Sequence, residues 1–113
     1  MSDRRSTGIS LTFYVPESRR LHGRLAYEWL LEQALKAGLH GGSAFHALAG
    51  FGRAHRLHEA AFFELAGDTP VAVNFVVNAD EETRLWALLE AEGVSLFYVR
   101  EPVEYGVLNG SVD

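Results

Sequence analysis

Residues 71–77 constrain the fold most, because they read Val-Ala-Val-Asn-Phe-Val-Val with almost no polar interruption. β-Branched and aromatic side chains favour strands, so this segment is predicted to be extended. An apolar residue at nearly every position, rather than every second one, is typical of a strand that is covered on both faces. Residues 67–70, Gly-Asp-Thr-Pro, predict a turn before it. The chain must therefore build a sheet around this strand.

The segments before this strand predict a strand, a helix and a further strand. Residues 9–15 alternate apolar and polar side chains up to Pro16, as a strand with one buried face does. Residues 24–37 repeat apolar side chains every three or four positions, which predicts a helix that ends at Gly38. Alternation resumes over residues 43–51, which predicts the strand that precedes the central one.

The segments after it complete the fold. Asn78 or Asp80 can cap a second helix that runs to about Glu92 and stops at Gly93. Residues 94–99 predict the last strand. The resulting βαββαβ order is that of the ferredoxin-like α+β fold. Right-handed crossovers place both helices on one face of a four-stranded antiparallel sheet, in a two-layer sandwich.

Length, charge and composition narrow the class of protein. A chain of 113 residues is one domain, in which we expect a disordered N-terminus, a folded domain and a C-terminal tail at residues 1–8, 9–101 and 102–113. A net charge of -5 argues against a nucleic-acid partner. The absence of cysteine excludes disulfides, thiolate metal sites and a cysteine nucleophile. Neither a signal peptide nor an apolar run of about 18 residues is evident, so we expect a soluble, cytoplasmic protein.

The second face of the sheet predicts an oligomer. The central strand is apolar on both sides, and helices cover only one of them. Along residues 43–51, Phe45 and Phe51 share one face. Ala44 and Leu48 lie on the other, which we expect to be the open one. The uncovered apolar patch would measure roughly several hundred Å², and monomers rarely expose a patch of that area. We therefore expect further copies of the chain to cover it. Alternatively, the C-terminal tail folds back over it.

The sequence Gly50-Phe51-Gly52-Arg53 is the first candidate ligand site. Two glycines around an aromatic residue let the backbone turn tightly and approach a ligand. Successive N–H groups in such a turn can bind an anion, and an arginine suits phosphate or carboxylate. The alternative is a bend or bulge with a solvated arginine. Arg100, just after the last strand, is a second candidate for an anion, as is a basic group formed by Arg19, Arg20, His22 and Arg24.

Histidines near this sequence raise a metal alternative. His46 lies on the strand and is also a candidate for the ligand site, and His55 and His58 follow in the polar segment beside Glu59. Histidine and carboxylate are metal ligands, but a site needs three or four of them to converge. The alternative is that they are solvated loop residues. No nucleophile elbow, HExxH motif or acid–base pair is evident, so we expect no enzymatic activity.

Residues 42–53, the polar loop after them and residues 71–77 together resemble the PII signalling proteins. In that family the second strand ends in Gly-Phe-Gly-Arg and leads into a long mobile loop. A PII-like branch, the family called domain of unknown function 190, is similar in further motifs. These are Tyr14-Val15, His22-Gly23, Ala37-Gly38-Leu39, Ala49-Gly50-Phe51-Gly52 and Arg56-Leu57-His58. The resemblance covers roughly residues 11–99.

The resemblance implies a homotrimer whose sheets pack inward, with a small effector such as an adenine nucleotide in clefts between subunits. It implies that Gly50, Gly52 and Arg53 belong to the cleft. Residues 54–67 would then be a mobile loop that docks onto a membrane transporter, an enzyme or another regulator. The docking residues would be His55, Arg56, His58 and Glu59.

The chain departs from the PII pattern where phosphates are bound. The Gly- and Lys-rich phosphate loop of that family is replaced here by Glu-Gly-Val-Ser at residues 92–95. Its two C-terminal clamp arginines fall on Gly106 and Leu108, and its adenine-side threonine on Ala44. We therefore expect a smaller or less charged ligand than ATP. A divalent-metal-binding trimer using His46, His55 and His58, or a small enzyme at the cleft, are the alternatives.

Overall fold

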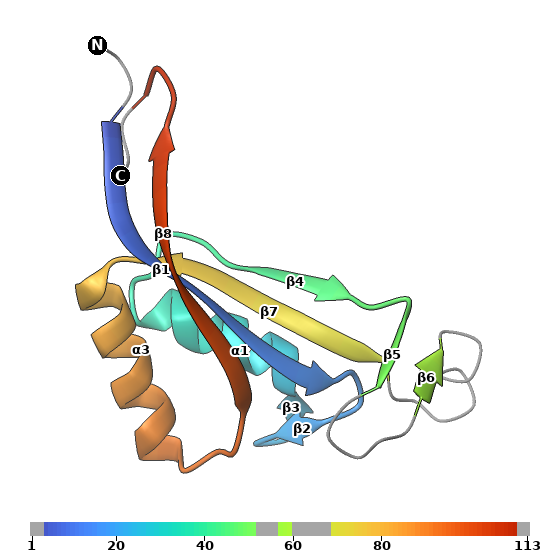
Figure 1. The fold of residues 1–113 in the computed structure, drawn as a ribbon. Coiled ribbons are helices and arrows are strands. Elements are labelled where there is room, and N and C mark those ends of the chain that lie inside the picture. Colours follow the sequence, from blue (N-terminus) through green and yellow to red (C-terminus); the bar gives the residue numbers. More distant parts are fainter. Residues whose placement is uncertain (1–3, 52–56, 60–68, 111–113) are drawn as a thin grey trace.

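The computed structural model describes residues 4–51, 57–59 and 69–110, and its core is a four-stranded sheet with two helices on one face (Figure 1). The strand order is β4-β7-β1-β8, and every neighbouring pair is antiparallel. The strands are β1 (Arg4–Pro16), β2 (Arg20–Leu21), β3 (Arg24–Leu25), β4 (Ser43–His46), β5 (Ala49–Phe51), β6 (Leu57–Glu59), β7 (Pro70–Val77) and β8 (Phe97–Val107), and the helices are α1 (Ala26–Lys36) and α3 (Ala79–Glu92). This is the predicted ferredoxin-like α+β fold.

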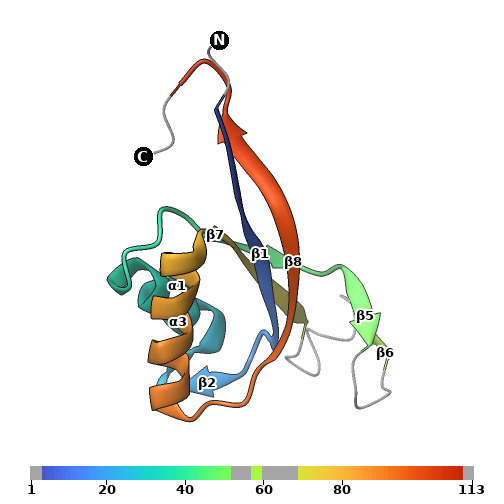
Figure 2. The same ribbon diagram turned by 60° about the vertical axis from the view of Figure 1, so that its left-hand side comes forward.

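The core lies between the sheet and the helices. Alternate residues of the two central strands point into it, as the sequence pattern predicts. The fully buried ones include Leu11 and Phe13 of β1 and Val73 and Phe75 of β7. Both helices lie on the same side of the sheet (Figure 2), and they add Trp29, Leu30, Leu85 and Leu89 to the core. One face of the sheet is therefore covered within the chain.

Local signals fix the second helix at both ends. The Asn78 side chain accepts a hydrogen bond from the backbone N–H of Glu81, and the Glu81 carboxylate accepts one from the N–H of Asn78. This reciprocal capping box satisfies two N–H groups that have no partner within the helix. Gly93 ends the helix in the left-handed conformation, with a φ of 65°. The predicted cap at Asn78 and the predicted stop at Gly93 are confirmed.

The first helix starts later than predicted. Its first residue is Ala26, whereas Arg24 and Leu25 pair with Arg20 and Leu21 in a small hairpin. Gly23 in that hairpin has a φ of 78°, which a glycine adopts easily. The chain thus turns once before the helix begins.

The predicted strand at residues 43–51 is two strands in different sheets. β4 pairs with β7 only as far as His46, opposite Val71. The next partner is Pro70, which can accept a hydrogen bond from the N–H of Ala47 but has no N–H to return. The chain therefore leaves the sheet, and β5 pairs with β6 instead.

The first and last strands extend beyond residues 9–101, the limits expected for the folded domain. The segment expected to be a disordered N-terminus enters β1 at Arg4, and the first half of the expected tail, residues 102–107, belongs to β8. Arg4 pairs with Val107, so the two strands form a long arm beyond the end of β7 (Figure 1). The last strand starts at Phe97 and runs through Pro102, which an edge strand tolerates because its outer side needs no donor. The arm and the sheet are one continuous ladder.

The uncovered side of the sheet is called the open face here, and its residues alternate with the buried ones. Phe45 lies on it, with 61% of its surface exposed, because it pairs with Ala72 and not with a core residue. The expectation that Ala44 and Leu48 mark the open side is wrong, since Ala44 pairs with buried Val73 and Leu48 lies after the end of β4, outside the sheet. The expected apolar character of this face is nevertheless present.

Candidate functional site

Polar side chains meet where β1 ends, β4 ends and β7 begins. Thr69 Oγ1 donates a hydrogen bond to Glu17 Oε1 at 3.1 Å, and His46 Nε2 lies 3.3 Å from the same oxygen. The backbone N–H of Glu17 donates to the Thr69 carbonyl at 2.7 Å. Thr69 is buried, whereas Glu17 and His46 are about half exposed. This cluster, called the strand-end cluster here, presents a carboxylate and an imidazole at one end of the sheet.

The sequence-predicted glycine lies next to this cluster. Gly50 is in β5, opposite His58 of β6. A Cβ atom on Gly50 would lie 3.7 Å from Cγ of Pro70, the residue after Thr69. Of the other predicted residues here, Gly52, Arg53, His55 and Arg56 lie outside the described residues, and Phe51, His58 and Glu59 are described by their backbone alone. The structure therefore places His46 and Gly50 at the same end of the sheet.

Arg100 lies far from them within the chain, because β8 and β4 are the opposite edges of the sheet. Its guanidinium donates from Nε to Glu82 Oε2 and from Nη2 to Glu82 Oε1, both at 2.9 Å. The indole N–H of Trp86 donates to the same carboxylate at 2.9 Å. Arg100 thus ties the edge strand to α3.

The Glu82 carboxylate is held in its charged form. The hydrogen bonds from Arg100 lower the pKa of Glu82, and the bond from Trp86 adds to this effect against the opposing effect of burial. The hydrogen bonds to Glu82 and the charge of its carboxylate raise the pKa of the Arg100 guanidinium. Both groups are therefore charged across the physiological range.

The basic group before the first helix is spread over separate contacts. Arg20 Nη1 donates to the carbonyl of Gly23 at 3.0 Å, and Arg24 pairs with Glu32. His22 Nε2 lies 2.7 Å from Glu92 Oε1 at the end of α3. These contacts fasten the small hairpin to both helices, so three of the four residues have a structural role.

The metal alternative has a pair of ligands in the described part of the chain. His46 and Glu17 face each other, but no third histidine or carboxylate joins them among the described residues. The other proposed ligands, His55 and His58, are respectively outside the described residues and described by backbone alone. A site with three ligands thus depends on side chains beyond those described.

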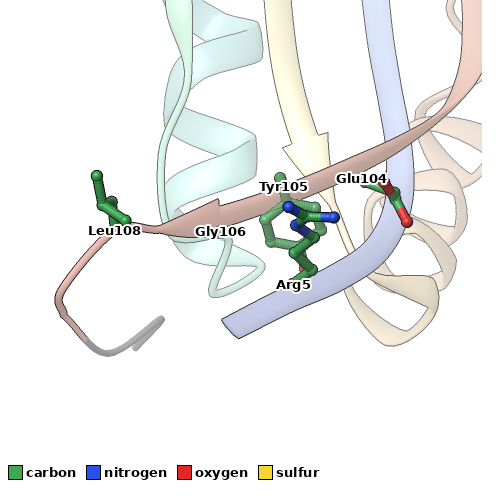
Figure 3. A pocket seen from close by; sticks show the side chains of 5 residues that line it. All are labelled: Arg5, Glu104, Tyr105, Gly106 and Leu108. Carbon is green, nitrogen blue, oxygen red and sulfur yellow. The ribbon is translucent and has the colours of Figure 1, made fainter. Parts of the chain in front are cut away.

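A shallow hollow of about 400 Å³ lies at the end of the arm (Figure 3). It is lined by Arg5, Glu104, Tyr105, Gly106 and Leu108. Gly106 and Leu108 are the positions that the PII clamp arginines would take, and Arg5 faces Gly106 across the ladder. The N-terminal strand thus brings a guanidinium to this part of the chain.

Sequence reasoning missed Glu17, Thr69 and Glu82. Glu82 and Trp86 are four apart on a predicted helix, and this spacing could have indicated their contact. No local signal indicates Glu17 or Thr69, because the register of β1 with β7 brings them together. Register depends on the packed sheet and not on neighbours in sequence.

Comparison with known proteins identifies the family. The family model DUF190, described as Uncharacterized ACR, matches residues 8–104. The chain belongs to the DUF190 family. The match starts in β1 and ends in β8, so it covers all four strands of the sheet and both helices. A relative of this DUF190 chain, the UPF0166 protein of Aquifex aeolicus (strain VF5), is 32% identical over 80 residues, which are 71% of this chain and 73% of the relative.

Solved structures show that the DUF190 chain has a PII-like fold. CPII, a nitrogen regulatory PII-like protein from Thiomonas intermedia K12 bound to ADP, AMP and bicarbonate, matches with a TM-score of 0.67. It is 15% identical, and the match covers 92% of each chain. A Thermus thermophilus protein described as a putative PII-like signaling protein matches with a TM-score of 0.60 and 16% identity, over 89% of this chain and 90% of the other. In the described part of the chain, neither helix is long and apolar enough to cross a membrane.

Proposed function

We propose that the protein is a non-enzymatic, cytoplasmic PII-like regulator that acts as a homotrimer. A small effector, an adenine nucleotide, binds in clefts between its chains. Residues 54–67 respond to the effector and dock onto a protein partner, a membrane transporter or an enzyme. The effector alters docking because it binds better to one arrangement of these residues than to the other.

The open face is the observation that carries this proposal. Five large apolar side chains on it are at least 40% exposed: Tyr14, Phe45, Val76, Phe97 and Val99. The rings of Tyr14 and Phe97 pack with their centroids 5.9 Å apart at an angle of 52°, so the patch is continuous across β1 and β8. A patch of this kind is typical of an interface. Three copies that meet through their open faces would remove it from water.

The positions of the predicted ligand residues support clefts between chains. Gly50 lies beyond the β4 edge of the sheet and Arg100 on the β8 edge. In a closed ring, each copy contacts the next through two different patches of its surface, and the proposal takes these to be the β4 edge of one chain and the β8 edge of the next. A cleft at each such junction would combine the strand-end cluster of one chain with the β8 residues of its neighbour.

The chemistry near Gly50 suits a nucleotide with few phosphates. Arg53 supplies a guanidinium for phosphate, and CPII, which shares the fold, is bound to ADP and AMP. Residues 92–95 contain no lysine and a single glycine, whereas the PII phosphate loop is rich in both. AMP or ADP should therefore bind better than ATP.

A thermal-shift panel tests the proposal. It compares AMP, ADP, ATP, cyclic AMP, bicarbonate, Zn²⁺ and Cu²⁺ on the full chain. A nucleotide at about 100 times its Kd should add roughly 2.7 kcal/mol of stability per site, which is several degrees in Tm for a domain of this size. No shift with any nucleotide would contradict the ligand assignment.

The same panel separates the alternatives. A shift with Cu²⁺ or Zn²⁺ that is lost in His55→Ala would favour the metal-binding trimer. Release of AMP, phosphate or another product from an added nucleotide would favour an enzyme. The proposal expects neither of these results.

A further inference from the structure

The centre of the open face holds a polar group formed by Ser10, Thr12 and Asn74, called the polar triad here. Asn74 Nδ2 donates to Ser10 Oγ at 3.0 Å and to Thr12 Oγ1 at 2.8 Å. Both hydroxyls come from β1, on either side of core residue Leu11, and Asn74 faces Thr12 from β7. The triad therefore joins the two central strands on their uncovered side.

Most of the large side chains around the triad are apolar. Thr12 and Asn74 lie opposite each other in one row across the sheet. In this row Val99 of β8 pairs with Thr12, and Ser43 of β4 pairs with Asn74. The rows before and after it carry Tyr14, Phe45, Phe97 and Val76, and Glu101 lies opposite Ser10 on the edge strand. An apolar surface that covers these side chains also covers the triad. Buried polar groups need hydrogen-bond partners, so the covering surface must supply them.

A count of donors and acceptors shows what the triad needs. An asparagine amide has two N–H groups, and both are used within the chain. Its carbonyl oxygen Oδ1 keeps two acceptor positions, and each hydroxyl keeps an O–H to donate. Among the described residues these groups have no further partner. Each hydroxyl oxygen also keeps one acceptor position. Two donors and four acceptor positions remain, so the acceptors of one copy can satisfy both donors of another.

Charge also favours a copy of the chain as the occupant. The chain has a net charge of -5, so two copies repel each other at most approaches. In the three rows around the triad, Glu101 is the one charged residue among those described, and it lies on the edge strand. Like-charged copies can therefore approach through the open face with little electrostatic repulsion.

We propose that the polar triad sets the number and register of copies that meet at the open face. Asn74 Oδ1 of one copy accepts hydrogen bonds from the hydroxyls of Ser10 or Thr12 of a neighbouring copy. Apolar contacts alone allow the faces to slide or to add further copies, whereas hydrogen bonds are satisfied in one arrangement. A single buried asparagine fixes register and copy number in coiled coils by the same principle. This inference rests on the proposed function, in which copies of the chain cover the face.

Sedimentation velocity on the full chain tests the inference with two variants and a control. Asn74→Val keeps a side chain suited to a strand and removes the triad, and Ser10→Ala combined with Thr12→Val removes its hydroxyls. Ser43→Ala is the control, because it removes a hydroxyl from the same row that makes no hydrogen bond to the triad. Wild type and control should sediment as one species of the same mass. Both triad variants should still associate but lose the single mass.

The outcomes separate this inference from the proposed function. A wild-type oligomer whose mass is unchanged in both triad variants would overturn the inference and leave the regulator proposal standing. A wild type that is a single chain at every concentration would overturn both. Circular dichroism of each variant shows that it is folded, and the Ser10/Thr12 variant decides the matter if Asn74→Val does not fold.

Discussion

Arg100 on the edge strand and Glu82 on α3 form a two-pronged ion pair, with both nitrogen–oxygen distances at 2.9 Å. The paired fork geometry fixes the direction of the strand relative to the helix. We predict that Arg100→Ala and Glu82→Gln each lower Tm, and that the double variant loses no more than the stronger single one. Thermal unfolding of the four proteins measures this coupling.

If the decreases in Tm of the two single variants add up in the double variant, the two side chains act independently. Exposed Glu104→Gln is the control, since it removes a carboxylate from the same strand without touching the pair. It should leave Tm nearly unchanged and should add to Arg100→Ala.

Glu81 and His40 connect the start of α3 to the segment before β4. His40 Nδ1 lies 2.7 Å from Glu81 Oε2, and Glu81 is almost completely buried. Burial opposes its charge, but hydrogen bonds from the backbone of Asn78 and from His40 outweigh this and lower the pKa of Glu81. A lowered folded-state pKa means that the stabilisation is present above the unfolded pKa, about 4.3, and is lost as pH falls through the lower folded value.

The lowered pKa of Glu81 determines how Glu81→Gln should change stability with pH. At about pH 7 the variant should be less stable than wild type by about 1 kcal/mol, because a neutral amide replaces the hydrogen-bonded charge. The difference should shrink as pH falls below about 4. Urea unfolding across this range measures it. Exposed Glu90→Gln on the same helix should show no such trend, and a constant difference for Glu81→Gln would refute the assignment.

Gly8 is required where the arm leaves the sheet. A Cβ atom there would lie 2.3 Å from the carbonyl oxygen of Val77 and 2.8 Å from Cε1 of Tyr105. The first neighbour is backbone, so the strands would have to shift. Gly8→Ala should therefore cost about 1–3 kcal/mol. Gly41→Ala, where a Cβ meets nothing within 4 Å, should cost almost nothing, and equal losses in urea unfolding would contradict this reading.

The elements predicted from sequence are those with local causes. The alternation that buries Leu11 and Phe13, the Asn78 cap and the Gly93 stop each depend on residues close in sequence, and the structure confirms them. The strand at residues 4–8 gave no such signal, because Arg-Arg-Ser-Thr-Gly has no apolar alternation. It is extended because β8 continues beside it.

The candidate site was less predictable than the fold. Gly50 and His46 were expected near a ligand, and the structure brings them to one end of the sheet. The partners of His46 and Arg100 come from strand register and helix packing, which sequence spacing does not encode. The prediction that Phe45 faces away from the open side was wrong for the same reason. Its pairing with Ala72 decides which side of the sheet it faces, and this pairing is not encoded in the local sequence.

Arg53 gives the most direct test of ligand chemistry. We predict that Arg53→Ala weakens AMP binding by about tenfold or more, which corresponds to about 1.4 kcal/mol, because the phosphate loses a charged partner. The oligomeric mass should not change. Isothermal titration with AMP measures the affinity, and Lys36→Ala removes an exposed positive charge from α1 as the control. Equal AMP affinity in both variants would remove Arg53 from the site.

Sedimentation equilibrium of the wild-type chain at micromolar concentration tests the central claim most directly. The account predicts one species with the mass of three chains, both with and without AMP. A species with the mass of one chain, with no tendency to associate as concentration rises, would contradict it.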